Sequence, residues 1–395
     1  MRSKRKLLIA GGSHSDISLI KAGKELGFYV ITTGNRPDDL GHKYSDEYHN
    51  VDFSNLNEML DLSKKLKIDS ICSCCNDFSV LSVSYVAEKL GLPGHDPYQT
   101  TLTLHHKDLY RKFVLENDIP SPYAESFDNF EEALKSADKY SFPLIIKPID
   151  LTGGKGVTKI MEKKDYGPAL EKAFTMSRAK RVVVEEFFTG TQHSFSSFIR
   201  DGKVVFYFSD NEYSFMNPYL VSTSSTPALV PESIDNKLIA SIEKISSLLS
   251  LKTGIFHVQF LVNGDKMTII EITRRCPGDM YTIPVYYSTG IDYASWIVKA
   301  ESGMDCSGLS RAEAKGFYGR HCIMSSHEGR VKNIVIDEEI KNNIADQLMW
   351  WKPGDKIADM YTSKFGITFM KYDSKDEMID KTRRLNKLIK VETYE

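Results

Sequence analysis

No run in the 395-residue sequence approaches the roughly 18 consecutive apolar residues that a membrane-spanning helix needs. Net charge is also nearly absent, because 51 Lys and Arg residues are balanced by 53 Asp and Glu residues. We therefore expect neither a broad nucleic-acid surface nor a polybasic attachment to membranes. Only four apolar residues precede the first glycine pair, too few for the core of a signal peptide. Together these absences predict a cytoplasmic protein.

Two common site signatures are missing as well. Three of the six cysteines lie within residues 70–75, but no second Cys or His cluster follows at zinc-binding spacing. We expect a buried strand end there, in a reducing compartment. The opening turn reads Gly11-Gly12-Ser13-His14 and lacks the GxGxxG fingerprint of dinucleotide-binding folds, so a hydride-transfer enzyme is not predicted.

Residues 5–95 alternate between strand-like and helical segments. Apolar runs predict strands at residues 6–10, 28–32 and 70–75, and helical periodicity predicts helices at 17–26, 55–66 and 78–90. This βαβ pattern indicates a parallel sheet with helices on both faces, and so a Rossmann-like domain over residues 1–95. His14, Asn76 and Asp77 fall on loops where such sheets bind ligands, although capping a helix is the favoured interpretation of each.

The pattern changes after about residue 96. We expect a helix over 104–116 and two hairpins, one turning at Asp201-Gly202 and one at Asn263-Gly264. Later segments predict a strand at 319–324, a helix near 338–347 and a final helix over 375–389. The predicted fold class is thus α/β and α+β: the Rossmann-like domain, a two-lobed domain over 96–300 with one lobe at about 120–190, and a small α+β subdomain over 301–395.

Two neighbouring segments favour phosphate binding. Lys147 ends an apolar strand and precedes a proline, so it could neutralise a polyphosphate or simply extend to the surface. The loop that follows contains Thr152, Gly153, Gly154, Lys155 and Gly156. Its glycines would let backbone N–H groups approach phosphate oxygens. The loop lacks the GxxxxGK[ST] pattern of a Walker loop, but its place just after Lys147 favours phosphate over an ordinary strand connection.

Residues 181–190 combine an apolar strand with carboxylates and aromatic rings. The strand Val182–Val184 leads into Glu185, Glu186, Phe187 and Phe188. Such a segment suits adenine, because its backbone can pair with the base edge while apolar side chains cover the base faces. An ordinary strand that ends at the surface explains the same residues equally well.

The segment 254–275 reads as a hairpin with a polar face. Gln259 shares a face with His257 on the first strand, and Glu271 shares one with Thr273 on the second. Oxygen ligands on adjacent strands suit Mg²⁺, although a solvated polar face is also common in antiparallel sheets. A three-residue turn, 263–265, with a bulge would pair Gln259 with Ile269 and bring Gln259, Glu271 and Thr273 to one face.

In their order and spacing these segments resemble the ATP-grasp superfamily, especially biotin carboxylase, the carbamoyl phosphate synthetase large subunit and amino-acid ligases. The resemblance covers nearly the whole chain and implies that ATP binds with Mg²⁺, or with Mn²⁺ in its place. It implies that Lys107 and Lys147 bind phosphate and that residues 152–156 form a lid. Adenine and ribose would bind at Glu185 to Phe188 and at Gln192. The metal ligands would be Gln259, Glu271 and Thr273, and the catalytic arginine would be Arg275. Gln192 replaces the usual Glu, and Thr273 the usual Asn.

The resemblance further implies a carboxylate–amine ligase that acts through an acyl phosphate on an amino acid or another small carboxylate, and that forms a homodimer. Residues 276–281 would line the acceptor site, and the aromatic and serine-rich stretch 213–226 reads either as a second binding loop or as a surface loop. Carbamoyl phosphate synthetase carries two such units and this sequence has one, so we do not expect that enzyme. We do not expect a biotin-dependent carboxylase either, because no biotin-carrier domain is found in the sequence. The alternative from another class is a non-catalytic nucleotide-binding regulator or scaffold.

Overall fold

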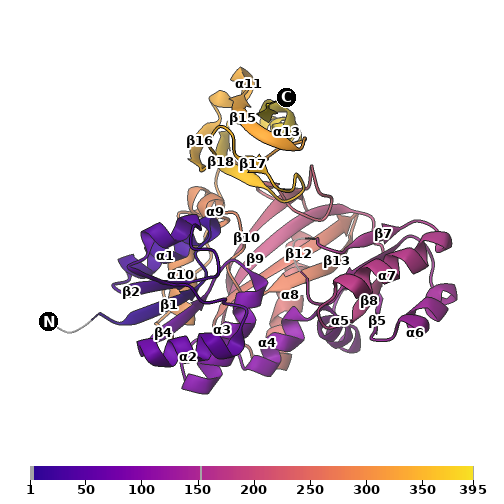
Figure 1. Cartoon of the computed structure of the whole chain (residues 1–395), viewed down its shortest axis with the longest axis horizontal. Coiled ribbons are helices and arrows are strands. Elements are labelled where there is room, and N and C mark those ends of the chain that lie inside the picture. Colours follow the sequence, from indigo (N-terminus) through magenta and orange to yellow (C-terminus); the bar gives the residue numbers. More distant parts are fainter. Residues whose placement is uncertain (1–3, 152–153, 395) are drawn as a thin grey trace.

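The computed structural model describes residues 4–151 and 154–394, arranged as Figure 1 shows. Its first part holds a four-stranded parallel sheet in the order β3-β2-β1-β4, which confirms the predicted α/β alternation. The strands are β1 (Lys6–Ala10), β2 (Tyr29–Thr33), β3 (Glu47–His49) and β4 (Ser70–Ser73). The helices are α1 (Ile17–Glu25), α2 (Leu56–Leu66) and α3 (Asp77–Leu90).

Helices cover both faces of this sheet because successive side chains of β1 point to opposite sides. Leu7 and Ile9 are buried in one cluster with Leu19 of α1. Leu8 is buried in a different cluster, with Met59 of α2. The sheet is therefore the middle layer of three, as a doubly wound domain requires.

The predicted single helix over 104–116 is wrong. The chain forms α4 (Tyr98–His105) and α5 (Lys107–Glu116), separated by His106, whose backbone is extended at φ −84° and ψ 119°. An extended residue cannot continue the i to i−4 hydrogen-bond ladder, so the helix axis changes direction there. The break has a functional consequence, since it places Lys107 in the first turn of a new helix.

A second, smaller sheet forms the lobe on the right of Figure 1. Its antiparallel order is β5-β8-β6-β7. The strands are β5 (Ala124–Phe127), β6 (Leu144–Pro148), β7 (Thr158–Ile160) and β8 (Val182–Glu186), and the covering helices are α6 (Phe130–Lys135) and α7 (Tyr166–Met176). Leu144 and Ile146 of β6 pack against Leu170 of α7, so this lobe has a core of its own.

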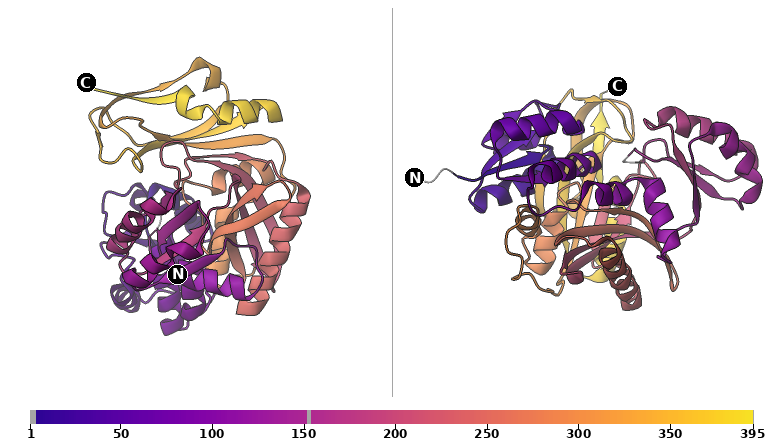
Figure 2. Two further views of the ribbon diagram at one scale, coloured as in Figure 1. Left: turned by 90° about the vertical axis from the view of Figure 1, so that its right-hand side faces the viewer. Right: turned by 90° about the horizontal axis from the view of Figure 1, so that it is seen from below.

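The largest sheet has eight antiparallel strands in the order β13-β12-β9-β10-β11-β14-β18-β16. Those strands are β9 (Thr191–Arg200), β10 (Lys203–Tyr213), β11 (Thr223–Thr226), β12 (Gly254–Asn263), β13 (Lys266–Thr273), β14 (Phe317–Met324), β16 (Ile344–Met349) and β18 (Lys364–Tyr372). The helices between them are α8 (Glu232–Leu249), α9 (Thr282–Thr289) and α10 (Tyr293–Glu301). We call this the central sheet; Figure 2 shows it between the parallel sheet and the small lobe.

One feature of the central sheet was expected from the sequence. The hairpin of β9 and β10 turns at Asp201 and Gly202, whose φ angles of 52° and 77° suit a two-residue turn. The α8 residues Ile234, Leu238 and Ile242 recur at helical spacing and are fully buried against the sheet. The predicted hairpin is confirmed.

The turn and register predicted for the β12–β13 hairpin are wrong. Asn263 pairs with Lys266, so only Gly264 and Asp265 form the turn. The pairing then shifts by one residue between Gln259 and Phe260, which leaves Ile270 as a bulge and places Gln259 opposite Glu271. Since directly paired residues share a face, the predicted common face of Gln259 and Glu271 is nevertheless confirmed.

The carboxyl-terminal segment departs most from expectation. The strand predicted at 319–324 is β14, but the helix predicted near 338–347 is only α11 (Glu338–Lys341), and β16 follows because it pairs with β18. The final predicted helix is split into α12 (Lys375–Thr382) and α13 (Leu385–Leu388). The chain then enters β19 (Ile389–Thr393), which joins β15 (Gly329–Ile336) and β17 (Lys356–Ile357) in a three-stranded sheet.

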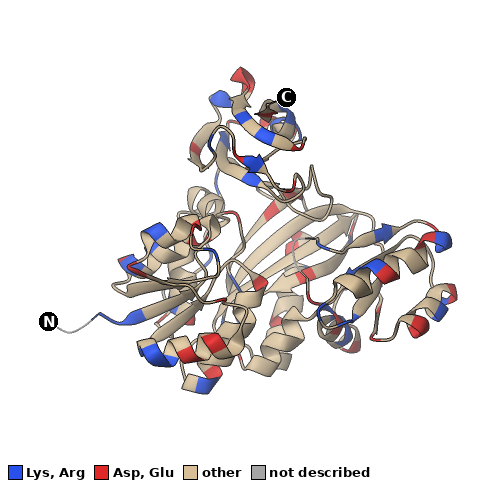
Figure 3. Ribbon diagram, in the orientation of Figure 1, with Lys and Arg blue, Asp and Glu red and all other residues tan. Residues whose placement is uncertain are grey.

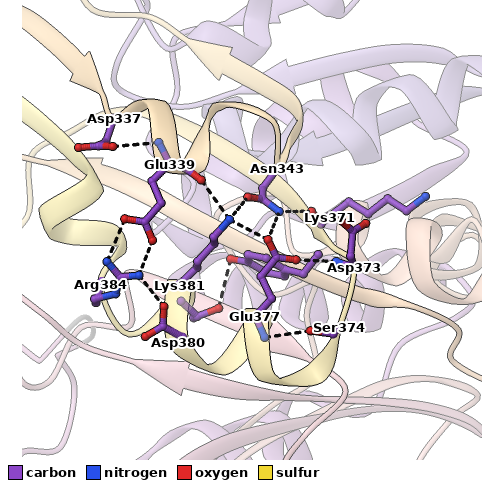
Figure 4. Close-up of polar contacts among 12 residues, drawn as sticks. Asp337, Glu339, Asn343, Lys371, Asp373, Ser374, Glu377, Asp380, Lys381 and Arg384 are labelled. Carbon is purple, nitrogen blue, oxygen red and sulfur yellow. Dashed lines mark hydrogen bonds and ion pairs between the residues drawn. The ribbon is translucent and has the colours of Figure 1, made fainter.

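A polar network fixes α12 against α11 in this segment (Figure 4). The Lys381 ammonium donates to the backbone oxygen of Glu339, to Asn343 Oδ1 and to Glu377 Oε1, at 3.0, 2.8 and 2.7 Å. Arg384 adds ion pairs to Glu339 and to Asp380. These side-chain bonds hold α12 in place, although the helix predicted over 375–389 is not continuous. Within residues 4–151 and 154–394, no helix has the length and apolarity to cross a membrane.

Candidate active site

A cavity of about 540 Å³ lies between the small lobe, the β12–β13 hairpin and the end of the parallel sheet. It brings together most of the residues that the sequence predicts for the site. Those on its wall are Lys107, Lys147, Gly154, Glu185, Glu186, Phe187, Phe188, Gln192, Gln259, Glu271, Thr273 and Arg275. Lys155 and Gly156 lie outside this wall, and Thr152 and Gly153 fall outside the described residues. We call this cavity the central pocket.

Lys147 enters the central pocket from β6 and is held by a buried ion pair. Its Nζ donates to Glu185 Oε2 at 2.6 Å, and Arg111 Nε donates to the other oxygen of Glu185 at 2.8 Å. Burial raises the pKa of the Glu185 carboxyl, but the two cations outweigh burial and lower that pKa to about 2. Burial lowers the pKa of the Lys147 ammonium, and Glu185 opposes this effect. The carboxylate of Glu185 therefore positions Lys147 and is not free to contact an adenine base.

Arg111 extends this arrangement to the β12–β13 hairpin. Its Nη2 donates to the carbonyl oxygen of Ile270 at 2.6 Å, and Nη1 donates to that of Ile269 at 3.4 Å. Ile270 is the bulged residue that brings Glu271 opposite Gln259. One buried guanidinium thus joins the Lys147 strand to the bulge. The sequence showed Arg111 only as part of the Lys107 helix, and long-range pairing of this kind leaves no local signal.

Lys107 contacts the chain shortly after the end of β6. Its Nζ donates to the backbone oxygen of Leu151 at 2.9 Å and stands 3.7 Å from Glu271 Oε1. The side chain of Glu271 is 45% exposed, so its carboxylate is open to the pocket. Lys107 and Glu271 are close enough to contact one bound polyphosphate and its counterion.

Gln259 and Glu271 form an oxygen pair that fits a hard divalent ion. They are direct partners on adjacent strands and so point to one face. The amide nitrogen of Gln259 donates to Glu212 Oε2 at 2.8 Å, which leaves its amide oxygen to accept or to coordinate. The third predicted ligand, Thr273, donates its hydroxyl to Asp77 Oδ1 at 3.2 Å. The residues present fit Mg²⁺, with Glu271 the only charged ligand of the predicted three.

Glu212 is a buried acid of the central pocket that the sequence reading missed. It accepts from Gln259 and also from Gln192, whose amide nitrogen is 2.9 Å from Glu212 Oε2. Burial and the neighbouring Asp210 raise the pKa of the Glu212 carboxyl to about 7. Glu212 lies near the end of β10, and nothing local in the sequence showed that this strand borders the pocket.

Arg275 follows the hairpin directly and pairs with Asp77. Its Nε donates to Asp77 Oδ1 at 2.7 Å, while the neighbouring Asn76 caps α3 through the backbone N–H of Phe78. Burial raises the pKa of the Asp77 carboxyl, but Arg275 outweighs burial and lowers it. Of the loop residues noted in the sequence, Asn76 therefore caps a helix and Asp77 orients the arginine.

Arg320 is a second buried cation on the wall of the central pocket. Its Nη1 donates to the carbonyl oxygens of Gly278 and Asp279, at 2.8 and 3.2 Å, and its Nε has no partner among the described residues. The side chain of Asp279 is held in turn by Lys364, which lowers the pKa of that carboxyl against the effect of burial. An arginine within the apolar run 319–324 was the available signal for this site.

Gly154, in the predicted lid loop, packs against Tyr219. A Cβ at Gly154 would lie 2.4 Å from the Cβ of Tyr219, and Gly154 has a φ of +73°. Beyond the loop, the backbone N–H of Lys159 donates to the Tyr219 hydroxyl at 3.1 Å. The stretch 213–226, left open between a binding loop and a surface loop, thus supplies Tyr219 to the wall of the central pocket.

We expect Gly154→Ala to weaken MgADP binding by about tenfold, because it adds backbone strain and a clash with Tyr219. Isothermal titration calorimetry measures this affinity. Gly264→Ala is the matched control: its φ is +58°, but a Cβ there would meet nothing within 4 Å. Equal affinities in wild type and Gly154→Ala would show that the lid contact does not affect nucleotide binding.

Residues 105–215 match the family described as phosphoribosylglycinamide synthetase, ATP-grasp (A) domain. The chain contains an ATP-grasp domain. The matched residues run from the start of α5 through the small lobe to β10, and include Lys107, Lys147 and Glu212. The predicted resemblance is confirmed, and the small lobe lies within the matched residues.

Similarity to other proteins extends beyond the ATP-grasp domain. The carbamoyl phosphate synthase large chain of Pseudothermotoga lettingae is 24% identical over 324 residues, which cover 78% of this chain and 29% of that protein. The chain spans 50% and 66% of the lengths of two further curated relatives. It therefore corresponds to only part of each of them.

Solved structures share the arrangement of the whole chain. The L-amino acid ligase from Bacillus licheniformis has a TM-score of 0.81 at 17% identity, and the match covers 100% of both chains. The biotin carboxylase domain dimer of Hydrogenobacter thermophilus 2-oxoglutarate carboxylase has a TM-score of 0.78 at 15% identity, covering 99% of this chain and 91% of that one. That structure is a complex with MgADP and bicarbonate. At these identities the likeness shows the fold.

Proposed function

We propose that this chain is an ATP-dependent ligase that joins a small carboxylate, such as an amino acid, to an amine. The observation that carries the proposal is the convergence of Lys147, Glu271 and Arg275 on one pocket from two segments that are far apart in the sequence. A polyphosphate under transfer needs cations around the moving phosphoryl group and a carboxylate for its counterion. The fold shared with an L-amino acid ligase supports the same class of substrate.

The nucleotide would lie along the cleft between the lid lobe and the β12–β13 hairpin. We assign adenine to the strand end at Glu186, Phe187 and Phe188, where backbone groups can pair with the base edge. Gln192 would accept from a ribose hydroxyl through its amide oxygen, because its nitrogen already donates to Glu212. The phosphates would then extend toward Lys147.

Glu271 and Gln259 would hold Mg²⁺, or Mn²⁺ in its place. When bound, the ion would neutralise charge on the phosphates of the nucleotide. Thr273 is the weakest proposed ligand, because its hydroxyl already donates to Asp77. Arg111 serves this site from a distance, since it fixes the bulge on which the position of Glu271 depends.

In the first chemical step a carboxylate oxygen attacks the γ-phosphorus, and the bond to the β–γ bridging oxygen breaks. Lys107, Lys147 and Arg275 surround the group that moves and stabilise its charge, so electrostatics and orientation supply the rate. The lid over Tyr219 would keep water from the acyl phosphate. An amine then attacks the carbonyl carbon and phosphate leaves, giving the new C–N bond, ADP and phosphate.

The acceptor end of the pocket is assigned to Arg320 and the segment Cys276–Tyr281. Gly278, Asp279 and Tyr281 line the pocket beside Arg320, whose Nε has no partner among the described residues. A buried guanidinium suits a carboxylate or an acyl phosphate, because both present paired oxygens. We therefore place the carboxylate substrate between Arg275 and Arg320.

Release of ADP in a mixed pool of amino acids tests the proposal. A ligase releases ADP from MgATP only when carboxylate and amine are both present. A nucleotide-binding regulator or scaffold binds MgADP but releases none above the rate without substrates. Binding without substrate-dependent release would replace the proposal by that alternative.

We also propose that the protein acts in the cytoplasm as a homodimer. The dimer named for the biotin carboxylase domain with the same fold supports this assembly. Analytical ultracentrifugation should give about twice the chain mass of 44.8 kDa. A species of the chain mass at micromolar concentration would contradict the dimer.

A further inference from the structure

A second cavity, of about 580 Å³, lies on the other side of the central sheet. Successive side chains of a strand point to opposite faces of the sheet. On β14, Arg320 lines the central pocket and the next residue, His321, lines the second cavity. The second cavity is enclosed by β14, β15, α13, β19 and the segment that precedes β11. Nothing in the proposed ligase mechanism uses it.

Lysines dominate the charge of the second cavity. Lys332 comes from β15, Lys387 from α13 and Lys390 from β19, whereas Glu392 is the only acid on the wall. Lys381 and Arg384 nearby are paired with carboxylates, but no ion pair among residues 4–151 and 154–394 includes the three cavity lysines. Figure 3 shows basic and acidic residues mixed over the rest of this carboxyl-terminal part. The cavity therefore has an excess of two positive charges.

The floor and one wall of the cavity have the features of a binding site. Ser222 is 2% exposed, and its hydroxyl has no partner among the described residues. His321 is 3% exposed, and its Nδ1 lies 2.6 Å from the hydroxyl of Thr223. Phe215 and Met216 form an apolar wall. Burial lowers the pKa of His321 to about 3, so the ring is neutral and the positive charge belongs to the lysines.

We propose that the second cavity binds a phosphate monoester that carries a planar or apolar group, and that this ligand regulates the central pocket. A dianionic phosphate matches the excess of two charges, and lysine ammonium groups bind phosphate as point charges. Phe215 and Met216 would contact the rest of the ligand. The volume suits a ligand of nucleotide or sugar-phosphate size.

One short segment connects the two cavities, which is why the proposal includes regulation. Phe215, Met216 and Ser222 line the second cavity, while Pro218–Val221 line the central pocket. Tyr219, in the middle of this segment, supports the lid through Gly154 and the backbone of Lys159. A ligand that orders this segment would change lid closure, and by linkage MgADP would change the affinity for that ligand.

Calorimetry with phenyl phosphate tests the site on the full chain saturated with MgADP. We expect saturable binding to the wild type and at least tenfold weaker binding to the double variant Lys387→Ala/Lys390→Ala. The matched control is Lys352→Ala/Lys356→Ala, two exposed lysines of the same region outside the cavity wall, which should bind as the wild type does. Benzyl alcohol, which lacks the charge, should not bind.

Absence of phenyl phosphate binding, or equal affinity in the wild type and the Lys387→Ala/Lys390→Ala variant, would overturn the site. Regulation has a separate readout, because the affinity for MgADP should change at least threefold when phenyl phosphate is added. Tyr219→Phe removes the hydroxyl that accepts from Lys159, so it should reduce this change while phenyl phosphate still binds. An unchanged MgADP affinity in the wild type would overturn the regulatory role. None of these measurements depends on the ligase reaction.

Discussion

Lys147→Ala is expected to lower substrate-dependent ADP release by at least about 10²- to 10³-fold, the usual loss when one preorganised charge is removed from a transition state. Lys147 reaches the central pocket in a fixed orientation because Glu185 holds it at 2.6 Å. Its effect should therefore fall on turnover and not only on nucleotide affinity. A coupled assay for ADP, run at saturating MgATP, separates the two.

Lys164→Ala provides the matched control, since Lys164 is an exposed lysine of the same lobe. It should leave ADP release unchanged. Near-normal turnover in Lys147→Ala would contradict the placement of the γ-phosphoryl group beside β6.

Glu271→Gln should lower ADP release to a similar degree and raise the Mg²⁺ concentration needed for half-maximal activity. The substitution keeps the size of the side chain but removes the only carboxylate among the predicted metal ligands. A titration with Mg²⁺ at fixed ATP measures the shift. An unchanged Mg²⁺ dependence would remove Glu271 from the metal site and leave the hairpin with a structural role.

Glu185→Gln is expected to lower the free energy of unfolding by about 3–5 kcal/mol at pH 7, because it leaves two cations in a buried site without their counterion. Glu185 is 2% exposed and contacts both Lys147 and Arg111. Urea unfolding followed by circular dichroism measures the loss. The matched control is Glu186→Gln at the next position, which is exposed and should change stability by no more than about 0.5 kcal/mol.

The same substitution should have a pH signature. The pKa of Glu185 is about 2 in the folded chain, whereas an unperturbed glutamate has a pKa of about 4.3. A depressed pKa stabilises the fold above about pH 4.3, and that stability is lost as the pH falls toward 2. The difference between wild type and Glu185→Gln should therefore shrink between pH 5 and pH 3. A difference that stays constant over this range would show that Glu185 acts by packing alone.

The parts of the fold with local periodicity were predictable from the sequence. Alternation in residues 5–95 predicts the parallel sheet, and Asp201-Gly202 predicts a hairpin that the structure confirms. Periodicity failed where pairing between distant strands competes with a helix. The residues after Lys341 form β16 because β18 offers an edge, and no property of that segment alone shows it.

The candidate site divides in the same way. Lys147 and Glu271 carry signals in their own segments, Lys107 and Arg275 follow from the family resemblance, and all four line the central pocket. Arg111, Glu212 and Arg320 carry no such signal, because their roles depend on contacts between residues far apart in the sequence.

The register of the β12–β13 hairpin shows how one local detail can mislead. The Asn263-Gly264 pair suggested a turn that includes Asn263, yet the turn is Gly264-Asp265. The bulge at Ile270 then restores the common face of Gln259 and Glu271. The face was predictable from the chemistry that a metal site needs, but the bulge that produces it depends on Arg111, 159 positions before Ile270.

The most direct test of the proposed reaction is the fate of the carboxylate oxygens. The chain would be incubated with MgATP, an amine and a carboxylate labelled with ¹⁸O, using the pair that gives the highest phosphate release in a screen. An acyl phosphate transfers one carboxylate oxygen to the phosphate that leaves, so mass spectrometry should find one ¹⁸O in each phosphate released. Unlabelled phosphate, or no release with any pair despite MgADP binding, would contradict the account.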